Sequence, residues 1–135
     1  MRRAIAAATL ILYLVVLFDL TLFRFYQPGA SANLVPFRTI ALDLHKGGWE
    51  MVVNFVGNVV VFLPMGLLVP TLWRGRSPLL RVAVACLTLS TLIESLQFAS
   101  GRRVADVDDV ILNVAGGVLG GLVWIGLGGG HRRSG

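Results

Sequence analysis

The sequence predicts an all-α membrane protein, a bundle of four transmembrane helices in a single domain of residues 1–135. Apolar residues make up 56% of the chain, and charged residues only 14%, against about 25% in typical soluble domains. The charges also fall in short clusters between long uncharged stretches, whereas nucleic-acid binding needs a basic face. A soluble core of this size could not bury so much apolar surface, and disordered chains are far more polar.

Four stretches are long and apolar enough to cross a membrane, which takes about 20 residues. The first carries the single charge of Asp19 and the third that of Glu94, whereas the other two carry no charge. The predicted spans are residues 4–23, 51–72, 82–99 and 110–130. A cleaved signal peptide is the competing interpretation, because residues 30–32 read Ala-Ser-Ala, but the first apolar stretch is too long and the site lies well beyond its end.

The arginines predict that both termini are cytoplasmic, because positive residues near span ends favour that side. The two termini and the loop between the second and third spans share one side of the membrane in this topology. That side holds seven cations and no acid, namely Arg2, Arg3, Arg74, Arg76, Arg81, Arg132 and Arg133. The opposite side balances five cations against five acids, so its positive charge is offset.

Residues 24–50 form the loop between the first two spans. Their sequence predicts a short helix that lies in the outer membrane interface. Apolar residues recur at helical spacing after Pro36, and Pro suits a first helical turn. Gly47 and Gly48 suit a helix stop, and Trp49 suits an interfacial anchor. A solvated loop is the alternative.

Polar side chains inside the spans gather toward the predicted outer ends. Residues three or four apart share a helix face, so these side chains form one stripe per helix. The stripes are Asn54 and Asn58 on the second span, Ser90, Glu94 and Gln97 on the third, and Asp109, Asn113, Gly116 and Gly120 on the fourth. Lipid disfavours polar stripes, and paired glycines allow helices to approach closely. We therefore expect the stripes to face one another around one outward-facing polar pocket.

Most of these polar residues also have a structural interpretation. Asp106 suits the N-cap of the fourth helix, and Asn54 and Asn58 could form hydrogen bonds between helices. Glu94 differs, because neither a cap nor a helix dipole explains an acid within a span. A functional role is therefore favoured for Glu94.

Four short motifs occur in order between residue 33 and about residue 121. They are Asn33-Leu34-Val35-Pro36-Phe37; Asn58 with Phe62-Leu63-Pro64-Met65-Gly66; Glu94-Ser95-Leu96-Gln97; and Arg103-Val104-Ala105-Asp106-Val107-Asp108-Asp109, continuing to Asn113. Together they resemble the VanZ-like family of bacterial integral membrane proteins, which often has an aromatic residue in place of Ala105. The resemblance implies a multi-pass protein of the bacterial cytoplasmic membrane with a role in the cell envelope. The family's founding member is linked to teicoplanin resistance.

The favoured function is binding or modification of a lipid or lipid-linked envelope precursor through the polar pocket. The candidate catalytic residues are Glu94, Asp109 and Arg103, and the candidate substrate-binding residues are Asn54, Asn58, Gln97, Asp106 and Asn113. The sequence predicts no nucleic-acid partner, and it leaves the ligand and the oligomeric state open.

An enzyme acting on a phospholipid-like substrate is the alternative. Glu94, Asp106 and Asp109 could hold a divalent cation, or one carboxyl could act as a general acid or base. Arg103 could clamp a phosphate. A transporter acting as an oligomer is a weaker alternative, because the chain places no ionisable group at the middle of its spans.

The predicted topology can be tested with single cysteines at positions 74 and 102 in a variant that lacks Cys86. A membrane-impermeant thiol reagent added outside cells should label position 102 and not position 74, because the arginine clusters place them on opposite sides. Labelling of position 74 alone would reverse the orientation and turn the polar pocket toward the cytoplasm.

Overall fold

The computed structural model is a helical bundle in which residues 1–24, 32–73, 75–101 and 104–129 are described. These residues form five α-helices and no β-strand longer than one isolated bridge. The helices are α1 (Arg2–Asp19), α2 (Arg38–Lys46), α3 (Gly48–Leu72), α4 (Pro78–Ala99) and α5 (Val107–Trp124). Two π-helical turns, η1 (Leu20–Arg24) and η2 (Ile125–Gly129), extend α1 and α5.

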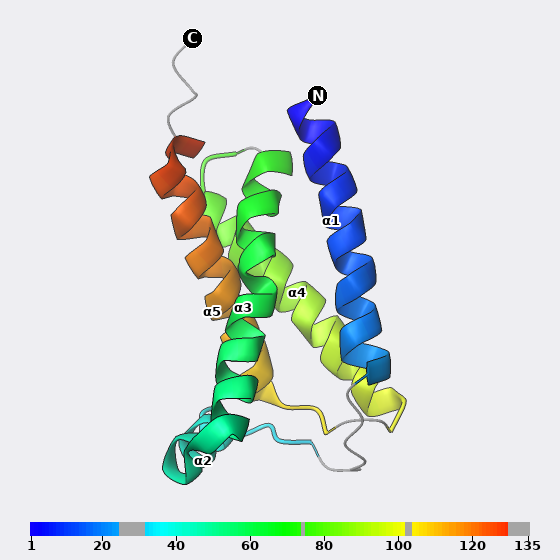
Figure 1. Ribbon diagram of the computed structural model, residues 1–135, viewed down its shortest axis with the longest axis vertical. Coiled ribbons are helices and arrows are strands. Elements are labelled where there is room, and N and C mark those ends of the chain that lie inside the picture. Colours follow the sequence, from blue (N-terminus) through cyan, green and yellow to red (C-terminus); the bar gives the residue numbers. More distant parts are fainter. Residues whose placement is uncertain (25–31, 74, 102–103, 130–135) are drawn as a thin grey trace.

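The structure confirms four helices that are long and apolar enough to cross a membrane. They are Arg3–Leu22, Met51–Leu72, Pro78–Ala99 and Val107–Gly129. The third begins earlier than predicted because Pro78 occupies its first turn, and the fourth because Asp106 caps it. In Figure 1, the start of α1 and the end of η2 lie at the same end of the bundle, as an even number of spans requires. Helix α2, which follows the first span, lies at the opposite end.

The helix predicted after Pro36 is also present, as α2. Gly47 ends it with a positive φ of 63°, which glycine adopts without strain, and α3 begins at the next residue. Leu42 and Leu44 remain at least half exposed on this helix.

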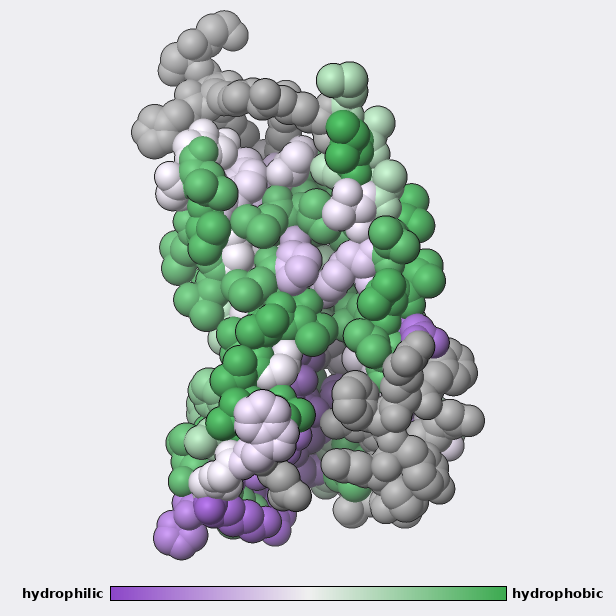
Figure 2. Space-filling view, viewed as in Figure 1, coloured by the Kyte–Doolittle hydropathy of each residue, from purple (hydrophilic) through white to green (hydrophobic). Residues whose placement is uncertain are grey.

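The face of the bundle in Figure 2 is mostly apolar among its coloured residues, and strongly hydrophilic residues gather on it at the α2 end. Ile11, Leu12 and Val15 of α1 are each more than 60% exposed, which suits contact with lipid. The Tyr13 hydroxyl holds α1 to α3 by donating to the Val61 carbonyl at 2.9 Å. The buried apolar core lies between the helices and consists of Leu17, Phe62, Met65, Val69, Val82, Cys86 and Ile93.

Helices α3 and α5 pack together more extensively than any other pair, and glycines make their close approach feasible. A methyl group on Gly116 would overlap the Val59 carbonyl oxygen, and one on Gly120 would overlap that of Leu63. Both glycines are buried. The glycine stripe predicted from the sequence therefore faces α3, and it fixes where α5 lies beside α3.

Leucine at Gly116 or Gly120 should force the two backbones apart, at a cost of about 1–3 kcal/mol or more. The matched control is Gly126→Leu, because Gly126 has open space around it. We expect Gly116→Leu and Gly120→Leu to lower the monodisperse yield and the melting temperature in detergent well below those of Gly126→Leu. Equal tolerance at all three positions would contradict this packing.

Candidate functional site

The candidate site lies where the start of α5 meets the chain segment that leads into α2. An isolated parallel bridge between Asn33 and Asp106 joins these segments. The Asn33 amide donates to the Ala105 carbonyl at 2.8 Å, and the Val107 amide donates to the Asn33 carbonyl at 3.0 Å. Two segments that are far apart in the sequence are thus fixed side by side at the α2 end of the bundle.

Asp108 caps helix α2 from the neighbouring helix α5. Its side chain is only 1% exposed. Oδ1 accepts a hydrogen bond from the Phe37 amide at 2.5 Å, and Oδ2 accepts from the amides of Thr39 and Ile40 at 2.7 and 3.1 Å. The amides of a first helical turn have no hydrogen-bond partner within their own helix, and the Asp108 carboxylate supplies one. Its negative charge also interacts favourably with the positive end of the helix dipole.

The sequence pattern did not predict this role for Asp108. Phe37 is the N-cap residue of α2, and its side chain makes no capping bond. Its φ of 65° is unusual for a residue with a side chain. A predicted helix whose preceding residues are Pro and Phe lacks a cap of its own. The missing cap could have indicated that a residue elsewhere accepts hydrogen bonds from the first amides of α2. It could not have identified Asp108, which lies about 70 positions further along the chain.

Asp106 joins three segments through one carboxylate. Oδ1 accepts from the Asp108 amide at 2.9 Å, which confirms the predicted N-cap of α5, and also from Asn33 Nδ2 at 2.9 Å. Oδ2 accepts from the Thr39 hydroxyl at 2.5 Å. Asp106 therefore has a structural role that is broader than capping alone.

Glu94 supports the start of α5 from α4. Its Oε2 accepts a hydrogen bond from the Asp106 amide at 2.8 Å, and its side chain is largely buried. The expectation that no cap explains Glu94 is therefore wrong, because this carboxylate satisfies the amide of the N-cap residue itself. Sequence spacing could not reveal this, since the contact depends on how α4 and α5 meet.

The two asparagines of α3 share one face, as predicted, and each binds an aspartate on another helix. Asn58 Nδ2 donates to Asp109 Oδ1 at 2.7 Å, joining α3 to α5. Asn54 Nδ2 donates to Asp43 Oδ2 at 3.3 Å, joining α3 to α2. The structural interpretation of these asparagines as links between helices thus has direct support in the contacts.

Gln97 and Asn113 are buried between helices. Gln97 Nε2 donates to the Thr21 carbonyl at 2.8 Å, and Asn113 Nδ2 donates to the Ser90 hydroxyl at 2.8 Å. Within the described part of the chain, Gln97 Oε1 and Asn113 Oδ1 have no hydrogen-bond partner. Both stripes therefore face inward, as expected, but these two amides connect helices instead of facing an open pocket.

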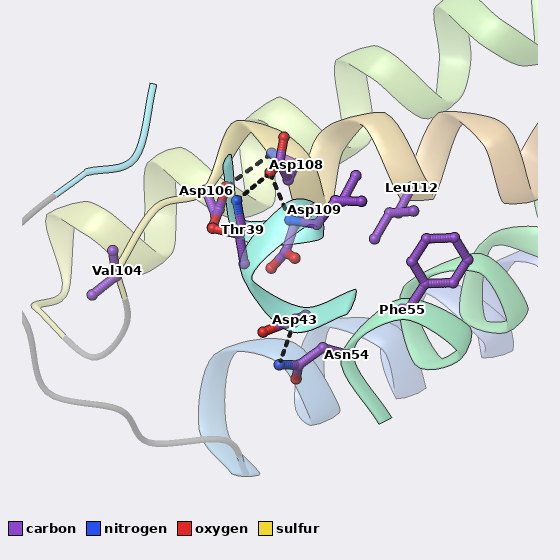
Figure 3. Close-up of a pocket in the computed structure, with 10 residues that line it drawn as sticks. Thr39, Asp43, Asn54, Phe55, Val104, Asp106, Asp108, Asp109 and Leu112 are labelled. Atoms are coloured by element: carbon purple, nitrogen blue, oxygen red, sulfur yellow. Dashed lines mark hydrogen bonds between the residues drawn. The ribbon is translucent and has the colours of Figure 1, made fainter. Parts of the chain in front are cut away.

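A small polar cavity, of about 90 Å³, lies between α2, α3 and the start of α5 (Figure 3). Four aspartates line it, and no Lys or Arg is among its described lining residues. Its walls are Thr39, Ile40, Asp43, Asn54, Phe55, Val104, Asp106, Asp108, Asp109 and Leu112. We call this the polar cavity. It brings together three of the predicted site residues, Asn54, Asp106 and Asp109.

A larger apolar groove, of about 520 Å³, runs beside α4. Its walls are Ala32, Leu34, Leu87, Thr91, Glu94, Ser95, Phe98, Ala105, Asp106, Val107 and Val110. We call this the α4 groove. Where one pocket was expected from the three stripes, the described residues of the stripes line two separate cavities. Asp106 is a wall residue of both, and Glu94 lines the groove alone. Asn58, Gln97 and Asn113 line neither.

The described residues contain no group of three His, Cys, Asp or Glu side chains that could hold a metal ion. The divalent cation considered for Glu94, Asp106 and Asp109 therefore gains no support, because Glu94 and Asp106 direct carboxylate oxygens at protein donors and Glu94 lines a different cavity from Asp109. Arg103, the candidate phosphate clamp, lies outside the described residues, so its role stays a prediction.

Comparison with known proteins agrees with the sequence motifs. The model of the VanZ/LLP1 family matches residues 10–128. A relative from Enterococcus faecium, Protein VanZ, is 32% identical over 128 residues, which cover 89% of this chain and 73% of the relative. No solved structure matches this chain.

The cap on α2 can be tested by comparing Asp108→Asn with Asp106→Asn. Both oxygens of Asp108 accept from backbone amides, so the NH₂ group that Asp108→Asn introduces would face a donor in either orientation and should cost about 1–3 kcal/mol. Asp106→Asn should cost less, because asparagine also caps helices and the Thr39 hydroxyl can accept.

The melting temperature in detergent and the rate of proteolysis between residues 33 and 47 measure this difference. Asp108→Asn should melt at a lower temperature and be cut faster than Asp106→Asn. The reverse order would show that Asp108 does not hold α2.

Proposed function

We propose that this chain, which belongs to the VanZ/LLP1 family, binds a lipid or lipid-linked cell-envelope precursor at the membrane surface. The observation that carries the proposal is a polar cavity built from three separate segments at one end of four membrane-spanning helices, with an apolar groove beside it. An amphiphilic ligand has a polar head and an apolar chain, and these two cavities offer a site for each.

The polar cavity favours a head group that donates hydrogen bonds. Asp43 and Asp109 line the cavity, with Asn54 and Thr39 beside them, whereas the carboxylates of Asp106 and Asp108 in the same wall accept from donors of the protein. Carboxylates in the wall match hydroxyl, amide or ammonium donors and repel a bare phosphate. Any phosphate of the ligand would need a cation to bind it, the role that the sequence predicts for Arg103.

We infer that both termini are cytoplasmic, because Arg3 lies at the start of α1 and Arg76 and Arg81 lie near the start of α4, at the end of the bundle opposite α2. Helix α2 would then lie in the outer membrane interface, where exposed Leu42, Leu44 and Trp49 suit contact with lipid. The polar cavity would face the outside of a bacterial cytoplasmic membrane, where it could meet envelope precursors. This location also connects the proposal to the teicoplanin resistance associated with the family.

The contacts deeper in the bundle favour binding at the surface over transport through the chain. The hydroxyls of Tyr13, Thr71 and Thr88 each donate to a backbone carbonyl. Transport needs polar groups that face a path near the middle of the membrane. These hydroxyls are instead directed at the helices themselves.

The test is the lipid that remains bound after gentle detergent purification, identified by mass spectrometry. The wild-type chain should retain one class of envelope lipid, and Asp109→Asn should retain about tenfold less, because it removes a charged acceptor from the polar cavity and keeps the Asn58 contact. Asp19→Asn is the matched control, since Asp19 lines neither cavity. Teicoplanin susceptibility of cells that express each variant should change in parallel with binding.

Retention of lipid by Asp109→Asn, Glu94→Gln and Arg103→Lys alike, at normal membrane expression, would contradict the proposal. Chemical conversion of the retained lipid by the purified wild-type chain would instead identify an enzyme, with Asp109 and Glu94 as the first candidates for acid–base chemistry.

A further inference from the structure

We propose that the α4 groove binds a single alkyl chain of a membrane lipid, with the chain lying along α4. This rests on the proposed function, because it assigns the apolar part of the same ligand to a separate surface. Apolar side chains from α4, from α5 and from the segment before α2 form most of the groove wall, including Leu34, Leu87, Phe98 and Val110.

The length of the groove matches one leaflet of a bilayer. Its α4 wall extends from Leu87 to Phe98, which is about 16 Å at 1.5 Å per residue. This is about half of the roughly 30 Å hydrocarbon thickness, the depth that one lipid chain occupies. The α4 wall of the groove also lies within Pro78–Ala99, a helix long and apolar enough to cross a membrane, so lipid chains would surround it there.

The volume of the groove is too small for a neighbouring helix. A helix with its side chains is about 10–12 Å wide, so about 16 Å of it occupies on the order of 1,500 Å³. The groove has a volume of about 520 Å³. An unbranched alkyl chain can enter this space, whereas a helix from a second copy could only cover the opening.

Continuity with the polar cavity argues for a lipid over a free hydrocarbon. Asp106 is a wall residue of both the polar cavity and the α4 groove. A chain in the groove therefore has its polar end beside the segment that carries the acceptors. The Ser95 hydroxyl lines the groove but donates to the Thr91 carbonyl at 2.7 Å, so it is satisfied without a polar ligand.

The probe is a phosphatidylglycerol with a photoreactive diazirine midway along one acyl chain, in nanodiscs of unlabelled phosphatidylglycerol. After illumination of the full-length chain, mass spectrometry should find the label mainly on residues 87–98 of α4. Residues 5–16 of α1, whose lipid-facing side chains line neither cavity, should carry several-fold less.

Thr91→Trp fills the groove, and Thr88→Trp is the matched control, since both residues are exposed on α4 and only Thr91 lines the groove. We expect Thr91→Trp to lower labelling of residues 87–98 about tenfold and Thr88→Trp to leave it unchanged. Monodisperse elution in detergent checks that both variants fold.

Equal labelling of α1 and α4, or labelling that Thr91→Trp does not reduce, would overturn the proposal. A disulfide between two chains through a cysteine at position 91, in a Cys86→Ala background, would overturn it as well by showing that a second copy covers the groove. These results are independent of the Asp109→Asn comparison. If the wild-type chain shows no preferential labelling of residues 87–98 but Asp109→Asn still lowers lipid retention, only the alkyl-chain site is contradicted. If residues 87–98 are labelled but Asp109→Asn retains lipid normally, only the head-group site is contradicted.

Discussion

The buried carboxylate of Asp108 is the constraint on which this end of the molecule depends. A charge removed from water is costly unless donors surround it, and here the donors are the amides of Phe37, Thr39 and Ile40. Those amides reach Asp108 only when α2 lies against the start of α5. The same contact satisfies the uncapped first turn of α2, so the two elements stabilise one another.

The other polar residues extend this arrangement into the membrane-spanning helices. From α4, Glu94 accepts from the amide of Asp106, the N-cap residue of α5, and from α3 Asn58 donates to Asp109. The glycine contact between α3 and α5 sets the backbone positions from which these side chains reach one another. Much of the polar cluster thus serves to assemble the helix ends, and the cavity and the groove are the spaces that this assembly leaves on either side of Asp106.

The sequence predicts the elements well because each is encoded locally. Long apolar stretches predict the four spans, and Gly47 with the apolar spacing before it predicts α2 and its end. Inward burial of the stripes on α4 and α5 also follows from helical periodicity, whereas Asn54 of the α3 stripe remains exposed. The partners of Asp108 and Glu94 do not follow from periodicity, because they depend on crossing angles between helices and on a bridge to Asn33 that no local pattern encodes. For the same reason one pocket was expected where the described residues of the stripes line two separate cavities.

Hydrogen–deuterium exchange of the chain in nanodiscs tests the central claim most directly, since it reports on the individual amides that Asp108 binds. We expect slow exchange at Phe37, Thr39 and Ile40, comparable to the interior of a spanning helix, although their segment lies at the end of the bundle. Exchange at these three amides as fast as in an unstructured peptide would contradict the claim, because α2 would then not be held by Asp108 and the polar cavity would lack one wall.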